Sequence, residues 1–134
     1  MAPPDARVAD TAERPAVPFR VVRMTARPHF LAAARSRWKA MPGLVLQGRD
    51  ARGDAGRDPE AIRVGFTCSK KVGNAVERNR AKRRLREVAR LILPNEGRPG
   101  WDYVLIGRHE ATDTRPFDAL CRDLSDALRK IHAA

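Results

Sequence analysis

The apolar positions of this chain repeat with the two periods of regular secondary structure. From Ala61 to Ser69 every second residue is apolar, as in a strand with one buried face. The side chains expected toward the core are Ile62, Val64, Phe66 and Cys68, and those expected on the opposite face are Arg63, Gly65, Thr67 and Ser69. That opposite face is small and polar, with one cation, so an extended chain has room to lie across it.

Helical spacing of apolar residues marks two longer segments. The first begins at Asn74, a good N-cap, and has Glu77 three residues later as in a capping box. Its expected buried stripe is Ala81, Leu85, Val88 and Ile92, and its end is expected in the Pro- and Gly-rich residues 94–100. The second helix is predicted from about Pro116 to His132, with its core stripe formed by Phe117, Leu120, Cys121, Leu124, Leu128 and Ile131.

Three shorter elements complete the pattern. A helix is predicted from about Ala26 to Arg37, with Phe30, Leu31 and Ala34 on one face. On the sequence alone, Phe30 is interpreted as a core residue rather than as a platform for a nucleotide base. Residues 43–49 are predicted to form a strand, with Leu44 and Leu46 on one face and Val45 and Gln47 on the other. Residues 102–108 form a nearly continuous apolar run, typical of a strand that is covered on both faces.

These elements predict one small α+β domain, an α/β sandwich with helices packed on a mixed sheet. The order expected for it, α-β-β-β-α-β-α, includes one strand more than the three marked above. The strand at 61–69, the helix after it and the strand at 102–108 make a βαβ unit, which indicates parallel pairing. Residues 48–59 lack periodicity and are expected to form a flexible connection between paired strands. Residues 1–20, rich in Ala and Pro, are expected to form a flexible arm, so that the domain spans residues 21–134.

Charge narrows the choice of partner. The net charge is +11 and the isoelectric point about 11.1, which favours a phosphate backbone as ligand. A solvated basic surface and a membrane-surface binder are the alternatives that charge alone leaves open. No apolar run approaches the ~18 residues of a spanning helix, and the first residues lack the apolar core that a signal peptide would have. The two cysteines, Cys68 and Cys121, lack metal-binding spacing. These features predict a cytoplasmic protein.

The basic charge is concentrated on the helix that begins at Asn74. Residues 78–90 contain seven cations and one acid, Glu87. The side chains expected on the face away from the apolar stripe are Asn79, Arg80, Arg83, Arg84, Arg86 and Arg90. A solvated face stabilised by i,i+4 ion pairs would need more acids than one Glu. The pattern therefore predicts a cationic face that binds a polyanion.

The sequence offers little for catalysis. It contains no nucleophile elbow, metalloprotease or phosphate-loop motif and no paired Cys/His spacing. The Asp residues of 50–58 lack the pattern of a calcium loop. Ser69-Lys70 has no partner in sequence that would make it a nucleophile, and His109-Glu110 is interpreted as a loop after a strand rather than as an acid–base pair. We therefore predict no catalytic residue and no metal site in the protein itself.

The segment S-K-K-V-G-N-A-V-E-R-N-R-A-K-R-R-L-R closely resembles the signature of the bacterial ribonuclease P protein subunit, built around an Arg-Asn-Arg core, here at residues 78–80. The order of elements fits that family over about residues 20–132. The resemblance implies a partner of a catalytic RNA that removes the 5′ leader of precursor tRNA by hydrolysis dependent on Mg²⁺, with the Mg²⁺ held mainly by the RNA. It also implies an unusual left-handed βαβ crossover, although the general rule favours a right-handed one.

The resemblance implies two binding surfaces. The contacts expected with the RNA subunit are Arg78, Asn79, Arg80, Lys82, Arg83 and Arg86. The contacts expected with the leader, in a cleft between the first helix and the sheet, are Phe30, Val45, Gln47, Arg63, Thr67, Ser69, Lys70 and Lys71. Many relatives carry aromatic residues where this chain has Ala34, and some do so at Gln47. Binding of the leader is therefore expected to depend more on charge than on stacking of aromatic rings.

Two other functions compete with this one. A general RNA-binding or ribosomal protein would have the same basic helix without any role in tRNA processing. A nuclease that acts without RNA would need a carboxylate cluster for metal ions, and none is evident in the sequence.

Overall fold

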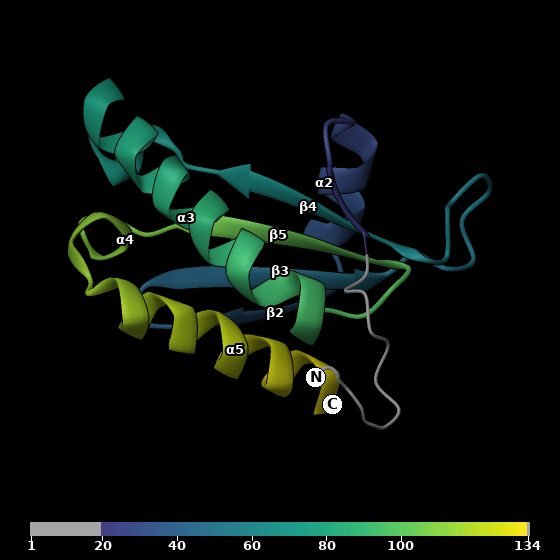
Figure 1. Ribbon diagram of the computed structural model, residues 1–134. Helices are drawn as coiled ribbons and strands as arrows, with labels where there is room; N and C mark the ends of the chain where they lie inside the picture. The colour runs from purple at the N-terminus through teal and green to yellow at the C-terminus, as the bar shows by residue number, and fades with distance from the viewer. Residues whose placement is uncertain (1–19, 134) are drawn as a thin grey trace.

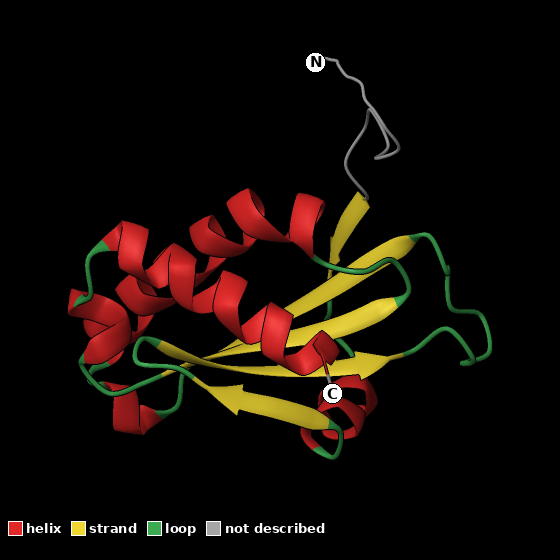
Figure 2. Cartoon of the chain, turned by 90° about the horizontal axis from the view of Figure 1, so that it is seen from below, coloured by secondary structure: helices red, strands yellow, loops and turns green. Residues whose placement is uncertain are grey.

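The computed structural model describes residues 20–133, which form one sheet with helices on both faces (Figures 1 and 2). The predicted flexible arm, residues 1–20, lies outside this range except for Arg20. The elements in chain order are β1 (Arg20–Arg23), α2 (Arg27–Ala34), β2 (Arg37–Ala40), β3 (Leu44–Asp50), β4 (Ala61–Thr67), the 3₁₀ turn η1 (Lys70–Val72), α3 (Ala75–Glu96), β5 (Trp101–Gly107), α4 (Ala111–Thr114) and α5 (Phe117–Ala133). The predicted order is confirmed, with β1 and α4 as additions.

The five strands lie in the order β1-β4-β5-β3-β2. β4 pairs with β1 and β5 in parallel, whereas β3 pairs with β5 and β2 antiparallel, so the predicted mixed sheet and the parallel βαβ unit are confirmed. The expected pairing of the strands on either side of residues 48–59 is wrong, because β5 lies between β3 and β4. The handedness of the crossover stays a prediction.

The main core lies between the sheet and the two long helices, α3 and α5, which cover the same face (Figure 1). The predicted core strand faces are confirmed: Leu44, Leu46 and Ile62 are fully buried there. The predicted stripe of α5 also lies in this core, with Phe117 and Cys121 at its partly buried margin. Within residues 20–133, no helix is both long and apolar enough to cross a bilayer.

A smaller core lies on the other face, under α2, and holds Met24, Ala33 and Val104 with Phe30 and Ile106 packed against them. The predicted apolar face of this helix is therefore partly wrong. Phe30 does pack inward, but Leu31 is 44% exposed and Ala34 is exposed as well. The helix is only eight residues long and packs across β5 and β3, and the side chain three residues after Phe30, Ala33, makes the contact instead.

α3 continues through Pro94 to Glu96 and ends at Gly97, within the residues where its end was predicted. The connection that follows β3 differs from expectation. The segment between β3 and β4 is tied down by side chains rather than left as a loose link. Arg49 donates two hydrogen bonds to Asp54, and Arg57, whose side chain is 2% exposed, donates to backbone carbonyls of β4 and β5. Alternating Arg and Asp therefore give this segment its own ion pairs.

His132, near the end of α5, is held in its neutral form by the core. Its ring packs edge-on against Trp101, and its Nε2 lies 2.7 Å from the Tyr103 hydroxyl, within hydrogen-bond distance. Burial, together with the charges of Arg98 and Arg37, lowers the pKa of His132 to about 4. Burial also raises the pKa of Tyr103, so the phenol stays protonated.

The lowered pKa of His132 predicts a loss of stability in mild acid. The unfolded chain takes up a proton near pH 6.5, whereas the folded chain does so only near pH 4, so the free energy of unfolding should fall between these values. In urea titrations at pH 7.5 and 5, His132→Asn should lose less stability than the parent on acidification. His109→Asn, at an exposed site, is the control and should behave as the parent does. Equal acid sensitivity of both variants would contradict the assignment.

Candidate nucleic-acid interface

The cationic helix α3 begins with the cap that its sequence predicts. The Asn74 side chain accepts a hydrogen bond from the Glu77 backbone N–H at 2.9 Å, and Glu77 Oε1 accepts one from the Asn74 backbone N–H at 2.8 Å. Residues 81, 85 and 88 are fully buried as expected, which fixes the opposite side of the helix toward solvent. The cap and the stripe together determine which arginines are presented outward.

Most of the predicted contacts with the RNA subunit lie on that outward face. Asn79, Arg80, Arg83 and Arg86 are exposed, whereas Arg78 and Lys82 are half-buried. Within residues 20–133, the four cations of this set that have no acid partner are Arg78, Lys82, Arg83 and Arg86. Arg86 also lies over the ring of Phe66, with its guanidinium carbon 6.0 Å from the ring centroid. Four unpaired cations on one helix repel one another unless an anion is bound.

Two arginines of α3 are used differently from what the sequence indicated. Arg80 forms a two-pronged ion pair with Asp113 of α4, with its Nε 2.5 Å and its Nη2 2.6 Å from the two carboxylate oxygens. The hydrogen bonds from Arg80 lower the pKa of Asp113 and keep it charged. The prediction that Arg84 lies on the cationic face is wrong. It is half-buried and donates hydrogen bonds to the backbone carbonyls of Thr112, Asp113 and Arg115, so it holds α4 against α3.

The face of the sheet that carries α2 brings most of the predicted leader contacts together. Strand register places Thr67, Ile106 and Val45 in one row across β4, β5 and β3, and Gly65, Val104 and Gln47 in the next row. Paired residues project to the same face of a sheet. α2 packs over part of this face (Figure 2), and the half-buried residues Val45, Gln47, Thr67 and Ile106 beside it are called the strip below.

Phe30 lies directly over Gly65 of β4. A methyl group built at Gly65 would come within 2.4 Å of the Phe30 ring, so only glycine leaves room for this packing. The ring is half-buried between the helix and the sheet, with one side against Val104 and Met24. Phe30 therefore belongs to the small core, as the sequence indicated, and its contact with the leader stays a prediction.

The end of β4 carries the remaining predicted contacts. Lys70 and Lys71 are exposed in η1, and within residues 20–133 neither has an ion-pair partner. The Ser69 hydroxyl accepts a hydrogen bond from the Lys71 backbone N–H at 3.2 Å and so caps the turn. This turn leads through Gly73 directly into α3. The two lysines therefore lie between the strip on the sheet and the cationic helix.

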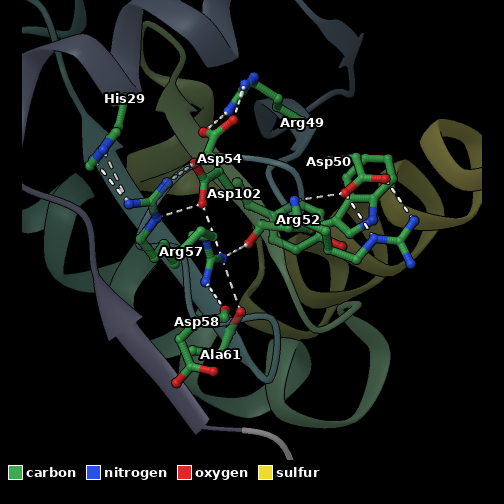
Figure 3. A network of polar contacts seen from close by, with 12 residues as sticks. His29, Arg49, Asp50, Arg52, Asp54, Arg57, Asp58, Ala61 and Asp102 are labelled. Atoms are coloured by element: carbon green, nitrogen blue, oxygen red, sulfur yellow. Dashed lines mark hydrogen bonds and ion pairs between the residues drawn. The ribbon is translucent and has the colours of Figure 1, made fainter.

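Arg63, the last predicted leader contact, belongs to a buried ionic network (Figure 3). Asp102 of β5 is completely buried and accepts two hydrogen bonds from Arg63, at 2.7 and 2.6 Å. A third comes from Arg57 at 3.2 Å. The Arg63 guanidinium also lies 3.2 Å from the ring nitrogens of His29 on α2. Asp102 thus orients Arg63 and links β4, β5 and the segment before β4.

Sequence reasoning missed Asp102 as a determinant of this site. The signal was present, because Asp102 is the one charged residue at the start of an otherwise apolar strand. A buried carboxylate requires a partner, and Arg63 was predicted on the polar face of the strand at 61–69. What the sequence did not supply was the strand order that places the two side by side.

The described residues show no arrangement typical of hydrolytic chemistry. No group of three or more His, Cys, Asp or Glu side chains within residues 20–133 is placed to hold a metal ion. His109 and Glu110 are both largely exposed, with 3.8 Å between the imidazole Nε2 and the carboxylate. Burial raises the pKa of both cysteine thiols, Cys68 and Cys121, and so disfavours the thiolate.

Comparison with known proteins gives one consistent family. A family model described as Ribonuclease P matches residues 20–132. The ribonuclease P protein component of Ruegeria pomeroyi is 64% identical over 107 residues, which cover 80% of this chain and 83% of that protein. The corresponding protein of Paramagnetospirillum magneticum is 47% identical over 116 residues, covering 85% of each chain.

Solved structures of proteins from the same family have a similar fold. The RNase P protein of Thermotoga maritima shares 27% identity with a TM-score of 0.62, over 81% of this chain and 96% of that one. The RNase P protein of Staphylococcus aureus shares 25% identity with a TM-score of 0.62, over 81% and 93% of the two chains.

Proposed function

The chain belongs to the ribonuclease P protein family, and from this premise we propose that it is the protein subunit of a ribonucleoprotein that removes the 5′ leader of precursor tRNA. In this proposal the RNA subunit contains the hydrolytic site, and the protein contributes binding energy and position. The observation that best supports this proposal is that the cationic surface has two adjoining parts, the outward face of α3 and the strip beside α2.

The outward face of α3 is proposed to dock on the RNA subunit. Arg78, Lys82, Arg83 and Arg86 lack acid partners in the described part of the chain, and guanidinium groups suit two-pronged contacts with phosphate. Neutralised phosphates release counterions, so each contact would contribute to affinity and to its dependence on salt. Arg80 would have to exchange Asp113 for a phosphate, and its net contribution should therefore be smaller.

The strip beside α2 is proposed to hold the single-stranded leader. Val45, Gln47 and Thr67 form the surface of this strip on the sheet, and Phe30 borders it on the side of α2. Lys70 and Lys71 of η1, which have no ion-pair partner within residues 20–133, lie at its end. Single strands of RNA bind well to a shallow cationic surface with an aromatic ring at its edge. Arg63, held by Asp102, would contribute positive charge at the covered end of the strip.

Mg²⁺ is proposed to be held mainly by the RNA subunit and to supply the chemistry of phosphodiester hydrolysis. The protein's part is to neutralise phosphates and to fix the precursor, so that fewer free cations are needed for the complex to form. This role places the protein in the bacterial cytoplasm, where tRNA is processed.

Reconstitution tests this function against the alternatives. The protein is mixed with a bacterial ribonuclease P RNA and precursor tRNA at low Mg²⁺, and cleavage at the 5′ end is followed. Cleavage should be much faster than with RNA alone. No improvement over the RNA alone would leave a general RNA-binding protein, and cleavage by the protein without RNA would indicate a nuclease.

A further inference from the structure

Trp38 is a conspicuous surface residue outside the two binding surfaces described above. Its side chain is 63% exposed. Among residues 20–133 it is the one exposed ring of a Phe, Tyr or Trp residue, because the others are buried or half-buried against the two cores. An exposed indole on a small, strongly charged protein gains free energy if a partner covers it.

Strand register shows which way this ring faces. Trp38 of β2 pairs with Gln47 of β3, which in turn lies beside Val104 of β5. Paired residues project to the same face, so Trp38 lies on the α2 side of the sheet, in the same row as Gln47. α2 packs across β5 and β3, with its end next to β2, while the Phe30 ring reaches Gly65 of β4, and every residue of β2 is exposed. The indole therefore lies at the open border of the predicted leader surface.

The charged residues next to Trp38 in sequence are all positive. No acidic residue occurs between Arg20 and Arg49, a stretch that includes α2 and β2. Trp38 is flanked in sequence by Arg35, Arg37 and Lys39; Arg37 is held by the backbone carbonyl of Ile131 at 2.7 Å, and the other two have no ion-pair partner within residues 20–133. An aromatic ring between unpaired cations favours a single-stranded nucleic acid, whose bases stack while its phosphates are neutralised.

We propose that Trp38 stacks on a base of the single-stranded leader where the leader leaves the strip and crosses the sheet edge at β2. The inference rests on the proposed function and extends it to a specific residue. From Thr67 on β4 to β2 is three strand spacings, about 14 Å, so one extended leader can contact η1, the strip and Trp38 in succession. Within the strip itself the only ring is Phe30, and it is half-buried against Gly65.

The test uses the protein reconstituted with ribonuclease P RNA and two precursor tRNAs, one with a leader of several nucleotides and one with a single nucleotide. Trp38→Ala should weaken binding of the long-leader precursor about tenfold and leave the short-leader precursor unchanged. Trp38→Phe should retain most of the affinity, because a phenyl ring also stacks. Leu31→Ala, another exposed apolar side chain, 44% exposed on α2, is the matched control and should have no effect.

The possible outcomes distinguish a failure of the Trp38 assignment from a failure of the proposed leader surface. If the parent complex binds both precursors equally well, the proposed leader surface itself fails. If the parent prefers the long leader but Trp38→Ala keeps that preference, the assignment of Trp38 is overturned and the leader surface stands. If Trp38→Ala weakens both precursors equally, Trp38 contacts another part of the RNA or a protein, and the proposal is again overturned.

Discussion

Replacing Asp102 with alanine is expected to lower the free energy of unfolding by about 3 to 5 kcal/mol. The Asp102 carboxylate is completely buried and pairs with Arg63, 16% exposed, and Arg57, 2% exposed. Removing it leaves two guanidinium charges in the interior without a counter-ion, and this is more costly than losing an exposed pair. Asp102→Asn keeps the shape but not the charge and should lose a large part of the same energy.

Urea unfolding of the free protein measures this effect. Asp118→Ala is the matched control, because Asp118 also pairs with an arginine, Arg122, but its side chain is 78% exposed. The control should change stability by less than about 1 kcal/mol. If Asp102→Ala unfolds at the same urea concentration as the control, the network does not stabilise the fold, and Arg63 must be held in place by other contacts.

The second large effect is on RNA affinity. Replacing both Arg83 and Arg86 with alanine should weaken binding to ribonuclease P RNA about a hundredfold, roughly tenfold for each phosphate contact. The slope of affinity against salt should become shallower by about 2. Both side chains are exposed on α3 and lack acid partners within residues 20–133, so the fold should tolerate their loss.

The control for this pair is Arg122→Ala on α5, which removes an equally exposed arginine from a helix that is not expected to touch the RNA. It should leave affinity and salt slope nearly unchanged. Arg80→Ala should have a smaller effect than Arg83→Ala, because Arg80 is already paired with Asp113. If the double variant binds as the parent does, the outward face of α3 is solvent-exposed in the complex, and the RNA subunit binds elsewhere.

Much of the fold follows from local patterns. Alternation predicted which face of β4 enters the core, and the Asn74–Glu77 capping box predicted where α3 begins, because both depend on residues close in sequence. Strand order depends instead on contacts between distant segments. The insertion of β5 between β3 and β4 could not be read from spacing, and the expected pairing was wrong for that reason.

The candidate site, too, could be predicted only in part from the sequence. The composition of α3 predicted a cationic face, and the structure places Arg83 and Arg86 on it. Which arginines are already engaged could not be predicted, because Asp113 and the carbonyls that hold Arg84 lie in α4, about 30 residues away in the chain. Trp38 is a similar case: its exposure and its place beside Gln47 follow only from the pairing of β2 at the sheet edge.

Site-directed crosslinking can show whether the two adjoining surfaces bind two different RNAs. A single cysteine carrying a photoreactive group is placed at Thr67 or at Arg83, in a background with Cys68 and Cys121 replaced. In the complete complex with precursor tRNA, the group at residue 67 is predicted to crosslink to the leader and the group at residue 83 to the ribonuclease P RNA. Crosslinks from both positions to the same RNA, or to the leader from residue 83 alone, would contradict the account.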